Sequence, residues 1–341
     1  MTSPAAHLAR KRLVRDALAA IAHASPADLP AALAAAYHPD AEWRGSHPLN
    51  EMTGLDAIAA AVWRPLHAAF PDLERRDSLM VAGDYEGHAF VGAVGHYCGT
   101  FQADWLGIPA TGQPIYLRYG EFHRVRDGRI DQSTVLIDIL DFIRQAGIWP
   151  VAPGTATEGM WPGPFTGDGM ALAESDPAVS AANLAQMRQM QMNLGLLGDI
   201  ETMGRNAMLI PSQLWGWHPK MMWYGPAGIG TTRGVEGFVD RHRMPFRRAF
   251  HNTGGGRHYI RLGDGAYSAT AGWPSLTLRH VGGDFMGLGP TGRDFTMRVM
   301  DFYLHHEGLI RENWVPIDIL HVLLQMGVDV FARIREVRGH R

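Results

Sequence analysis

The chain has 341 residues, of which 46% are hydrophobic and 19% are charged, and its formal net charge is −3. This length fits two domains of ordinary size, and the composition excludes a disordered or polyelectrolyte chain. A chain so close to neutrality lacks the basic surface that nucleic acids and anionic membranes attract. We therefore expect neither as a partner, and expect a small, weakly charged molecule or another protein as the ligand.

Cys98 is the only cysteine, which excludes an intramolecular disulfide and a cysteine zinc site. No apolar run approaches the roughly 20 residues that cross a bilayer. The N-terminal stretch spreads charges among its apolar residues, as an amphipathic helix does and a signal peptide does not. These features predict a soluble cytoplasmic protein.

Residues recur in order along the chain at a constant spacing of 180 positions. The recurring pairs include His38 and His218, Trp43 and Trp223, Arg118 and Arg298, and Asp138 and Asp318. An ordered series at one spacing indicates a duplicated unit. One stretch fits only with a gap, which matches His96 in HYCGTF with His280 in HVGGDF and leaves residues 102–105 as an insertion in the first copy.

Between the copies lies a stretch rich in proline and glycine, residues 150–169, which is typical of a linker. We expect a first domain over residues 1–150, a linker over 151–175 and a second domain over 176–341. Duplicated units commonly replace a symmetric dimer, so the two domains are expected to form an intramolecular pseudo-dimer. Further assembly into a homo-oligomer is left open.

Each copy begins with helical periodicity and continues with strand-like sequence. A helix is predicted over residues 56–70 and again over 235–250. The strands predicted in the first copy cover residues 80–81, 89–97, 115–126 and 129–140. Helices followed by an antiparallel meander predict an α+β fold in which helices cover the open face of a curved sheet and enclose a conical cavity.

Asp138 and Asp318 each lie inside an apolar run, VLIDIL and VPIDIL. A carboxylate at the end of an apolar strand is costly unless it is paired or functional, and burial raises its pKa. These residues are therefore candidates for general acid/base catalysis. Asp is also a good helix N-cap, and the sequence leaves this alternative open.

His96 and His280 are candidates to orient such an Asp, share its proton or hold a substrate oxygen, and a structural role is equally compatible. Arg118 and Arg298 lie in predicted strands, and the nearby Glu121 and Asp301 are expected on the opposite face of those strands. Each arginine either pairs with a carboxylate, Asp138 being one possible partner, or fixes a substrate oxyanion. No metal-ligand spacing recurs in both copies, so no metal site is expected.

Four tryptophans are candidates for substrate contacts. Trp43 and Trp223 lie where the helices meet the first strand, and either line the cavity mouth or close the core. Trp105 has no partner in the other copy under the gapped alignment, and Trp314 is predicted to share a strand face with Asp318. The glycine-rich HNTGGGR lacks the Lys-Ser/Thr of a P-loop, and no dinucleotide fingerprint or nucleophile elbow occurs.

The stretches LGIPATGQPIYLRYGEFHRVRDGRI and IDILDFIRQAGI in the first copy resemble the SnoaL-like polyketide cyclases, which belong to the nuclear transport factor 2-like superfamily. In the second copy MGLGPTGRDFTMRVMDFYLHHEGLIRENWVPIDILHVLLQMGV resembles them as closely. The resemblance covers residues 35–150 and 215–332. It implies a cone-shaped α+β barrel with an apolar pocket and no metal or organic cofactor, which the duplication would place twice in tandem. It also implies an intramolecular aldol closure with an Asp as acid/base, and Asp138 and Asp318 match that Asp.

The chain departs from the family in being a tandem pair and in having Pro316 shortly before Asp318. The fold alone does not give the reaction. We therefore consider an acid/base enzyme acting on a carbonyl-containing small molecule, as a cyclase or a related dehydratase or isomerase. The alternatives are a hydrolase in which the Asp activates water, and a non-catalytic binding or assembly module in which the Asp is a helix cap.

Overall fold

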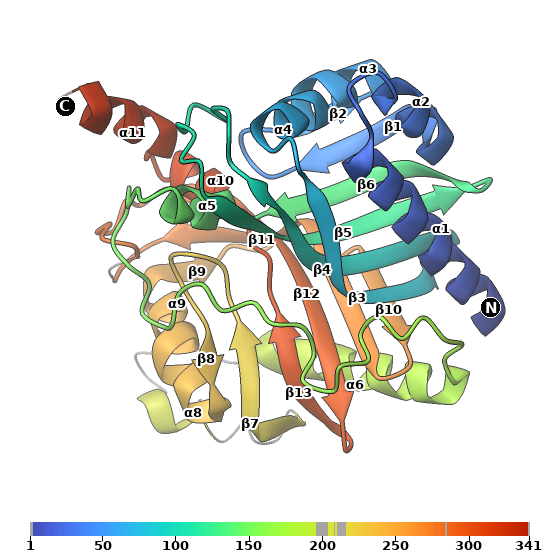
Figure 1. Cartoon of the computed structure of the whole chain (residues 1–341). Helices are drawn as coiled ribbons and strands as arrows, with labels where there is room; N and C mark the ends of the chain where they lie inside the picture. The colour runs from blue at the N-terminus through green and yellow to red at the C-terminus, as the bar shows by residue number, and fades with distance from the viewer. Residues whose placement is uncertain (1–2, 196–203, 208, 210–215, 284, 340–341) are drawn as a thin grey trace. The chain divides into compact units, whose positions relative to one another are not determined.

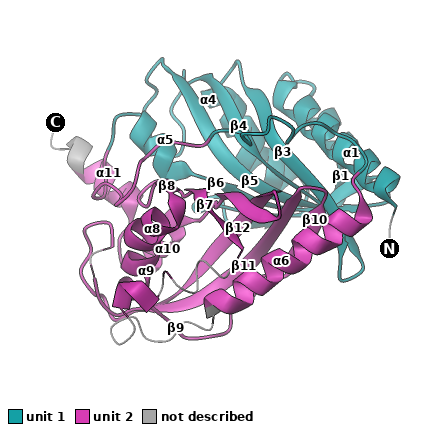
Figure 2. Ribbon diagram, turned by 90° about the horizontal axis from the view of Figure 1, so that it is seen from below, with its two compact units in different colours: residues 1–148, 162–174 teal, residues 149–161, 175–341 magenta. Residues whose placement is uncertain are grey.

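The computed structural model describes residues 3–195, 204–207, 209, 216–283 and 285–339. The chain divides into two compact units, shown in Figures 1 and 2. Unit 1 consists of Met1–Ile148 and Pro162–Glu174, and unit 2 of Trp149–Trp161 and Ser175–Arg341. The segment between the two copies is thus shared between the units.

Unit 1 begins with two helices and continues with a sheet. Its helices are α1 (Pro4–His23), α2 (Leu29–Ala36), α3 (Leu55–Ile58), the π-helix η1 (Ala59–Trp63), α4 (Arg64–Ala69) and α5 (Ile139–Gln145). Its strands are β1 (Tyr37–Gly45), β2 (Glu51–Thr53), β3 (Glu74–Tyr85), β4 (His88–Thr100), β5 (Pro114–Arg126) and β6 (Arg129–Ile137). Helix α1 starts where the Ser3 side chain accepts a hydrogen bond from the Ala6 N–H, and it buries Val14, Leu18 and Ile21 at helical spacing.

The strands of unit 1 follow the order β2-β1-β6-β5-β4-β3. The predicted antiparallel meander is confirmed for β3 to β6. The sequence predicted no pairing for β1, which runs parallel to β6 and makes the sheet mixed. These two strands are far apart in the sequence, and parallel strands need such a long connection between them. The other neighbours pair antiparallel.

Unit 2 repeats this architecture. Its helices are α6 (Pro177–Gly195), α8 (Gly234–Phe238), the π-helix η2 (Val239–Arg243), α9 (Met244–Ala249), α10 (Ile319–Gln325) and α11 (Val330–Gly339). Its strands are β7 (Trp217–Tyr224), β8 (Thr232–Arg233), β9 (Phe250–Asn252), β10 (Ile260–Asp264), β11 (Tyr267–His280), β12 (Asp294–His306) and β13 (Leu309–Trp314). The order β10-β11-β12-β13-β7-β8, with β7 parallel to β13, matches that of unit 1. The prediction of two copies of one α+β fold is therefore confirmed.

The sheet register corrects the gapped alignment of His96 with His280. The Phe101 N–H donates to the carbonyl of Gln113, and the His280 N–H donates to the carbonyl of Arg293, which lies 180 positions after Gln113. His280 therefore occupies the position of Phe101, and His96 and His280 are not equivalent.

An irregularity in β11 causes this difference between the two copies. Its register with β12 shifts between Gly272 and Leu276, whereas the pairing of β4 with β5 is continuous. The expected insertion that ends in Trp105 is also wrong. Trp105 exchanges two backbone hydrogen bonds with Ile108, and Phe285 does the same with Leu288. Trp105 therefore has a counterpart in Phe285.

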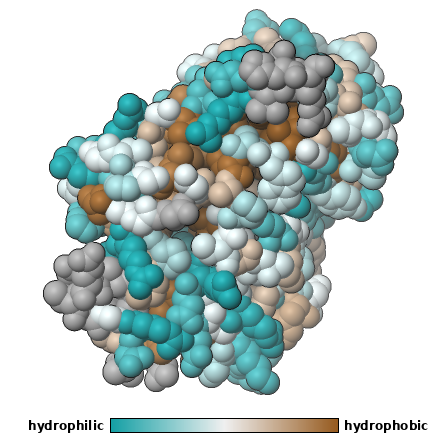
Figure 3. Space-filling view, turned by 90° about the vertical axis from the view of Figure 1, so that its left-hand side faces the viewer, coloured by the Kyte–Doolittle hydropathy of each residue, from teal (hydrophilic) through white to brown (hydrophobic). Residues whose placement is uncertain are grey.

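The surface mixes polar and apolar residues. On the face in Figure 3, hydrophilic residues lie among smaller hydrophobic areas. The exposed large apolar residues include Tyr116, Trp149 and Phe165. None of the helices in the described part of the chain is long and apolar enough to span a membrane.

Candidate functional site

Asp138 and Asp318 lie at the start of the helix that follows the last strand in each copy. Strand β6 ends at Ile137, so Asp138 does not continue the strand as its apolar run predicted. It is the N-cap of α5 and accepts a hydrogen bond from the Asp141 N–H at 3.0 Å. Asp318 caps α10 in the same way, accepting from the His321 N–H at 3.2 Å.

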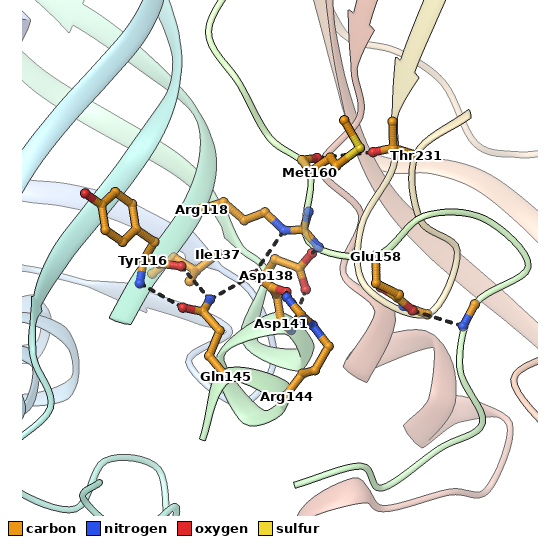
Figure 4. A network of polar contacts seen from close by, with 12 residues as sticks. Tyr116, Arg118, Ile137, Asp138, Asp141, Arg144, Gln145, Glu158, Met160 and Thr231 are labelled. Atoms are coloured by element: carbon orange, nitrogen blue, oxygen red, sulfur yellow. Dashed lines mark hydrogen bonds and ion pairs between the residues drawn. The ribbon is translucent and has the colours of Figure 1, made fainter. Parts of the chain in front are cut away.

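Each of these carboxylates also forms an ion pair with the arginine of the neighbouring strand. Arg118 lies 2.9 Å from Asp138, and Arg298 lies 3.0 Å from Asp318. Figure 4 shows Arg118 directed at Asp138 and Asp141 at the start of α5. Burial of both partners makes these charge-assisted contacts strong and their loss costly.

The same two helices are fastened to the sheet by a matched glutamine. The Gln145 side chain accepts from the Tyr116 N–H at 2.9 Å and donates to the Tyr116 carbonyl at 2.8 Å. Gln325 makes the same two contacts with the backbone of Thr296. The helix starts that carry Asp138 and Asp318 are therefore anchored structural elements.

The two candidate histidines have different surroundings. His96 lies opposite Arg118 on adjacent strands, and burial together with the charge of Arg118 lowers the pKa of its imidazole to about 4. His280 contacts the Thr291 hydroxyl through Nδ1 at 3.2 Å, and burial lowers its pKa. In unit 2 the guanidinium of Arg298 lies instead over the ring of Trp273, 4.2 Å from its centroid.

The four candidate tryptophans are buried and dispersed. Trp43 contacts the ring of Trp63 edge-on, and Trp223 stacks on His242 with ring centroids 3.9 Å apart. Trp314 stacks on Tyr224, opposite Phe302 in the sheet. Trp105 packs against Phe70 and Phe142. The sequence candidates therefore do not gather in a single site.

A second polar cluster lies on the opposite, helix-covered face of the unit 1 sheet. Its centre is Glu121, which is fully buried and pairs with Arg75 at 2.8 Å. Arg75 also pairs with Asp77 at 2.6 Å. The Tyr97 hydroxyl donates to Glu121 at 3.0 Å, and His123 contacts its other oxygen at 3.1 Å.

Helix η1 covers this polar cluster, and the contacts of Glu121 fix its charge state. The ring of Trp63, in η1, contacts the ring of Tyr97 and places the helix over this face. Burial raises the pKa of Glu121, but the charge of Arg75 and the hydrogen bond from His123 outweigh it and lower the pKa to about 2. Glu121 therefore stays ionised and has no proton to exchange near neutrality.

In unit 2 the same position is Asp301, and its surroundings differ. Asp301 lies opposite Thr270 and is partly exposed. Asn313 donates to it at 3.4 Å, and the Tyr303 hydroxyl donates as well. Among the residues that the structure describes, no cation forms an ion pair with Asp301. Loss of solvent raises the pKa of Asp301 to about 6, against the lowering effect of the bonds from Asn313 and Tyr303.

The difference arises at the edge of the sheet. In unit 1 the long strand β3 places Arg75 opposite Tyr97. In unit 2 this edge consists of the short strand β9, the glycine-rich residues 253–256 and the start of β10 at Ile260. The arginine that neutralises Glu121 therefore has no strand position from which to reach Asp301.

Sequence reasoning placed Glu121 and Asp301 on the face opposite the arginines and did not select them. Strand alternation was sufficient to separate the faces, since Arg118 and Glu121 are an odd number of residues apart. The available signal was an acidic residue at the same position of both copies, on the face that the helices cover. Within the described residues, no group of three or more His, Cys, Asp or Glu side chains is arranged to hold a metal ion.

The repeated order of helices and mixed sheet defines each unit as a nuclear transport factor 2-like α+β fold. The family model described as SnoaL-like polyketide cyclase matches residues 13–146 and 214–326, which is more than half of the chain. The chain therefore belongs to the SnoaL-like polyketide cyclase family.

Solved structures of similar proteins match single units. AclR from Streptomyces galilaeus is 22% identical, with a TM-score of 0.34, covering 41% of this chain and 96% of its own. IdmH from Streptomyces antibioticus is 23% identical, with a TM-score of 0.33, and the match covers 39% of this chain and 98% of IdmH. An NTF2-like protein from Burkholderia thailandensis is 24% identical, with a TM-score of 0.32, and the match covers 44% of this chain and 100% of that protein. The search of curated proteins found no match to the chain.

Proposed function

We propose that the protein is a cofactor-independent acid/base enzyme that acts on a carbonyl-containing small molecule, with Asp301 of unit 2 as the group that moves the proton. Membership of the SnoaL-like polyketide cyclase family supports this class of reaction. The observation that carries the assignment is a partly exposed, desolvated carboxylate that has two hydrogen-bond donors and no ion pair with any described residue.

The chemistry follows from the state of this carboxylate. At neutral pH a carboxyl group with a pKa of about 6 is mostly ionised, so it can accept a proton, and its acid form can return one. Asp301 takes a proton from a carbon next to a carbonyl, and the electron pair forms an enolate. The enolate carbon attacks a second carbonyl of the same molecule, a carbon–carbon bond forms, and the alkoxide takes the proton back. Tyr303 and Asn313 hold the carboxylate in place through their hydrogen bonds.

Asp301 fits this role better than the residues first selected by sequence. One oxygen of Asp138 accepts from a helix N–H and the other faces Arg118, so both are occupied by structural contacts. The same holds for Asp318 and Arg298. Catalysis by Asp138 or Asp318 stays a prediction, which the experiment below tests beside Asp301.

A non-catalytic role is favoured for unit 1 by one observation. The carboxylate at the position of Asp301 is Glu121, and it is held in an ion pair with Arg75. A buried, paired carboxylate is a poor proton acceptor because its pKa is far below neutrality. Unit 1 therefore fits a structural or binding module. In unit 2 the alternative to a cyclase is a hydrolase, in which Asp301 would activate water.

Exchange of a carbon-bound proton tests the proposal without knowledge of the substrate. The aryl methyl ketone 2-acetylnaphthalene is incubated with the full chain in D2O, and loss of the methyl signal is followed by NMR. Asp301→Asn should slow protein-dependent exchange by about 10²–10⁴-fold. Asp138→Asn, Asp318→Asn and Glu121→Gln should leave the rate nearly unchanged. Exchange that survives in Asp301→Asn, or that is lost only in Asp138→Asn or Asp318→Asn, would move the base elsewhere.

A further inference from the structure

Arg261 projects from the same face of the unit 2 sheet as Asp301. Arg261 of β10 lies directly opposite Thr270 of β11, and Thr270 lies directly opposite Asp301 of β12. Residues paired directly across a sheet share a face. Two strand spacings separate Arg261 from Asp301, which is about 10 Å between their backbones.

Helix α6 covers this face, and Arg261 is half-buried there. A Cβ atom added at Gly263, two residues after Arg261, would lie 2.4 Å from the carbonyl oxygen of Ser180 in α6. The helix reaches the same face again at His305, where Gln186 contacts the imidazole at 2.7 Å. Arg261 therefore lies between the sheet and its covering helix.

One buried polar atom of Arg261 and one of its neighbour His258 are left without partners in the described part of the chain. The Nε of Arg261 and the Nδ1 of His258 are both buried, and neither has a hydrogen-bond partner there. No described carboxylate forms an ion pair with Arg261. Burial and the nearby charge of Arg261 lower the pKa of His258 to about 4. A neutral imidazole thus accompanies a cation that has no counter-charge among the described residues.

The surrounding sequence is strongly basic. Residues 241–261 contain six arginines and no acidic residue. Arg243, at the end of η2, is buried and donates to the carbonyl of Leu194 in α6. Burial and the charge of Arg247 lower its pKa to about 9, so it remains a cation at neutral pH. Unit 2 thus carries buried positive charge where its helix η2 meets α6.

The fold does not require these cations, because unit 1 lacks them at the same positions. Met80 takes the place of Arg261, since Met80 lies opposite Ala93 and Ala93 lies opposite Glu121. Trp63 ends η1 where Arg243 ends η2. Arg261 is half-buried, and its buried Nε is left without a hydrogen-bond partner at a cost in free energy. A ligand that brings a carboxylate offsets that cost with a bidentate hydrogen bond.

We propose that Arg261, with His258 beside it, is a subsite for a carboxylate group, so that unit 2 takes carbonyl compounds that are anionic. The inference rests on the proposed function, because it takes Asp301 as the group that contacts the reacting end of the substrate. The carboxylate lies several bonds from the carbon that loses its proton, because about 10 Å separates the two backbone positions.

Matched probes test the subsite by binding alone. Affinities of 6-acetyl-2-naphthoate and 6-acetyl-2-naphthamide for the full chain are measured by calorimetry at neutral pH. The carboxylate should bind at least about tenfold more tightly, as expected for a charge-assisted pair. Arg261→Met, which places the residue of unit 1 at this position, should abolish the preference. Arg261→Lys should retain part of it, and Arg248→Met, at an exposed arginine of α9, should retain it fully.

The outcomes separate this inference from the proposed function. Equal affinities, no binding of the carboxylate at millimolar concentration, or a preference that persists in a folded Arg261→Met would overturn the subsite. The same titrations in Asp301→Asn use a protein without the proposed base. A retained carboxylate preference with exchange unaffected by Asp301→Asn would refute the base and keep the subsite. If wild type shows no carboxylate preference but exchange still depends on Asp301, the subsite is refuted and the base is kept.

Discussion

Glu121 and Asp301 occupy one position in the two copies of the fold, and the chain gives them opposite charge environments. Arg75 lies 2.8 Å from Glu121, and His123 contacts it on the other side. Among the described residues, Asp301 receives only neutral donors, from Asn313 and Tyr303. The shift of the pKa downward in one unit and upward in the other follows from this difference in partners.

Removal of Arg75 should destabilise unit 1 strongly. Arg75→Met leaves two buried carboxylates, Glu121 and Asp77, without their cation, and breaking a buried pair in this way costs about 3–5 kcal/mol. Chemical denaturation at neutral pH measures the loss. The double variant Arg75→Met/Glu121→Gln should recover a substantial part of it. A single variant as stable as the wild type would show that the ion pair contributes nothing.

Asp301→Asn should change the pH dependence of stability. The pKa of Asp301 rises from 3.8 in a model peptide to about 6 in the folded chain, so the folded state favours the protonated form. Its ionisation therefore destabilises the fold as pH rises from 4 to 6. The free energy of unfolding of the variant, relative to the wild type, should increase across this window and level off above it. Denaturation series between pH 4 and pH 8 provide the measurement.

Glu121→Gln is the matched control with the opposite sign. The pKa of Glu121 falls from 4.5 to about 2 in the folded chain, so its ionised form stabilises the fold above pH 4.5. The deficit of this variant should be complete at neutral pH and should shrink as pH falls from 4.5 towards 2. Parallel profiles for the two variants would contradict the assignment of different environments.

Asp138→Asn should destabilise the protein without affecting proton exchange. The substitution keeps a helix cap but removes the charge that faces Arg118, and both partners are buried. We expect a loss of about 3 kcal/mol in the free energy of unfolding. Asp318→Asn should cost less, because Arg298 still lies over the ring of Trp273. A melting temperature that holds or rises in Asp138→Asn would instead indicate an unpaired, desolvated carboxylate.

His96 should remain neutral throughout the physiological range. Burial and the charge of Arg118 place the pKa of its imidazole near 4, below the ordinary value of 6.5. Protonation therefore occurs in the unfolded chain first, and the stability contributed by neutral His96 is lost as pH falls from 6.5 to 4. Histidine chemical shifts followed by NMR should show no titration of His96 between pH 8 and pH 5.5. A midpoint above 6 would contradict the buried position beside Arg118.

The duplication and the fold class could be read from the sequence because spacing survives divergence. The offset of 180 residues locates both π-helices, both capping Asp residues and both strand arginines. Alternation along β5 also separated Arg118 from Glu121 correctly. The end of β6 was placed beyond Ile137 because VLIDIL remains apolar through the helix start. Apolar runs do not distinguish a strand from the buried turn of helix that follows it.

The site could not be predicted because it depends on residues far apart in the chain. Nothing in the sequence around Glu121 shows that Arg75 lies beside it, and nothing around Asp301 shows that the equivalent edge is glycine-rich. The irregularity in β11 between Gly272 and Leu276 hid the true partner of His280. The sequences HYCGTF and HVGGDF share His, Gly and Phe, so they favour an alignment of His96 with His280. The backbone hydrogen bonds instead align Phe101 with His280.

The segment between the copies ties each unit to a remote piece of the chain. The Gly169 carbonyl accepts a hydrogen bond from the Met80 N–H of β3, and Thr157 pairs with Thr231 beside β8. The backbone therefore passes from one unit to the other three times, near residues 148, 161 and 174. A single proteolytic cut anywhere in the chain leaves at least one unit incomplete. A gene for either unit alone would need its remote piece spliced onto a new end, because neither unit is one continuous stretch of the chain.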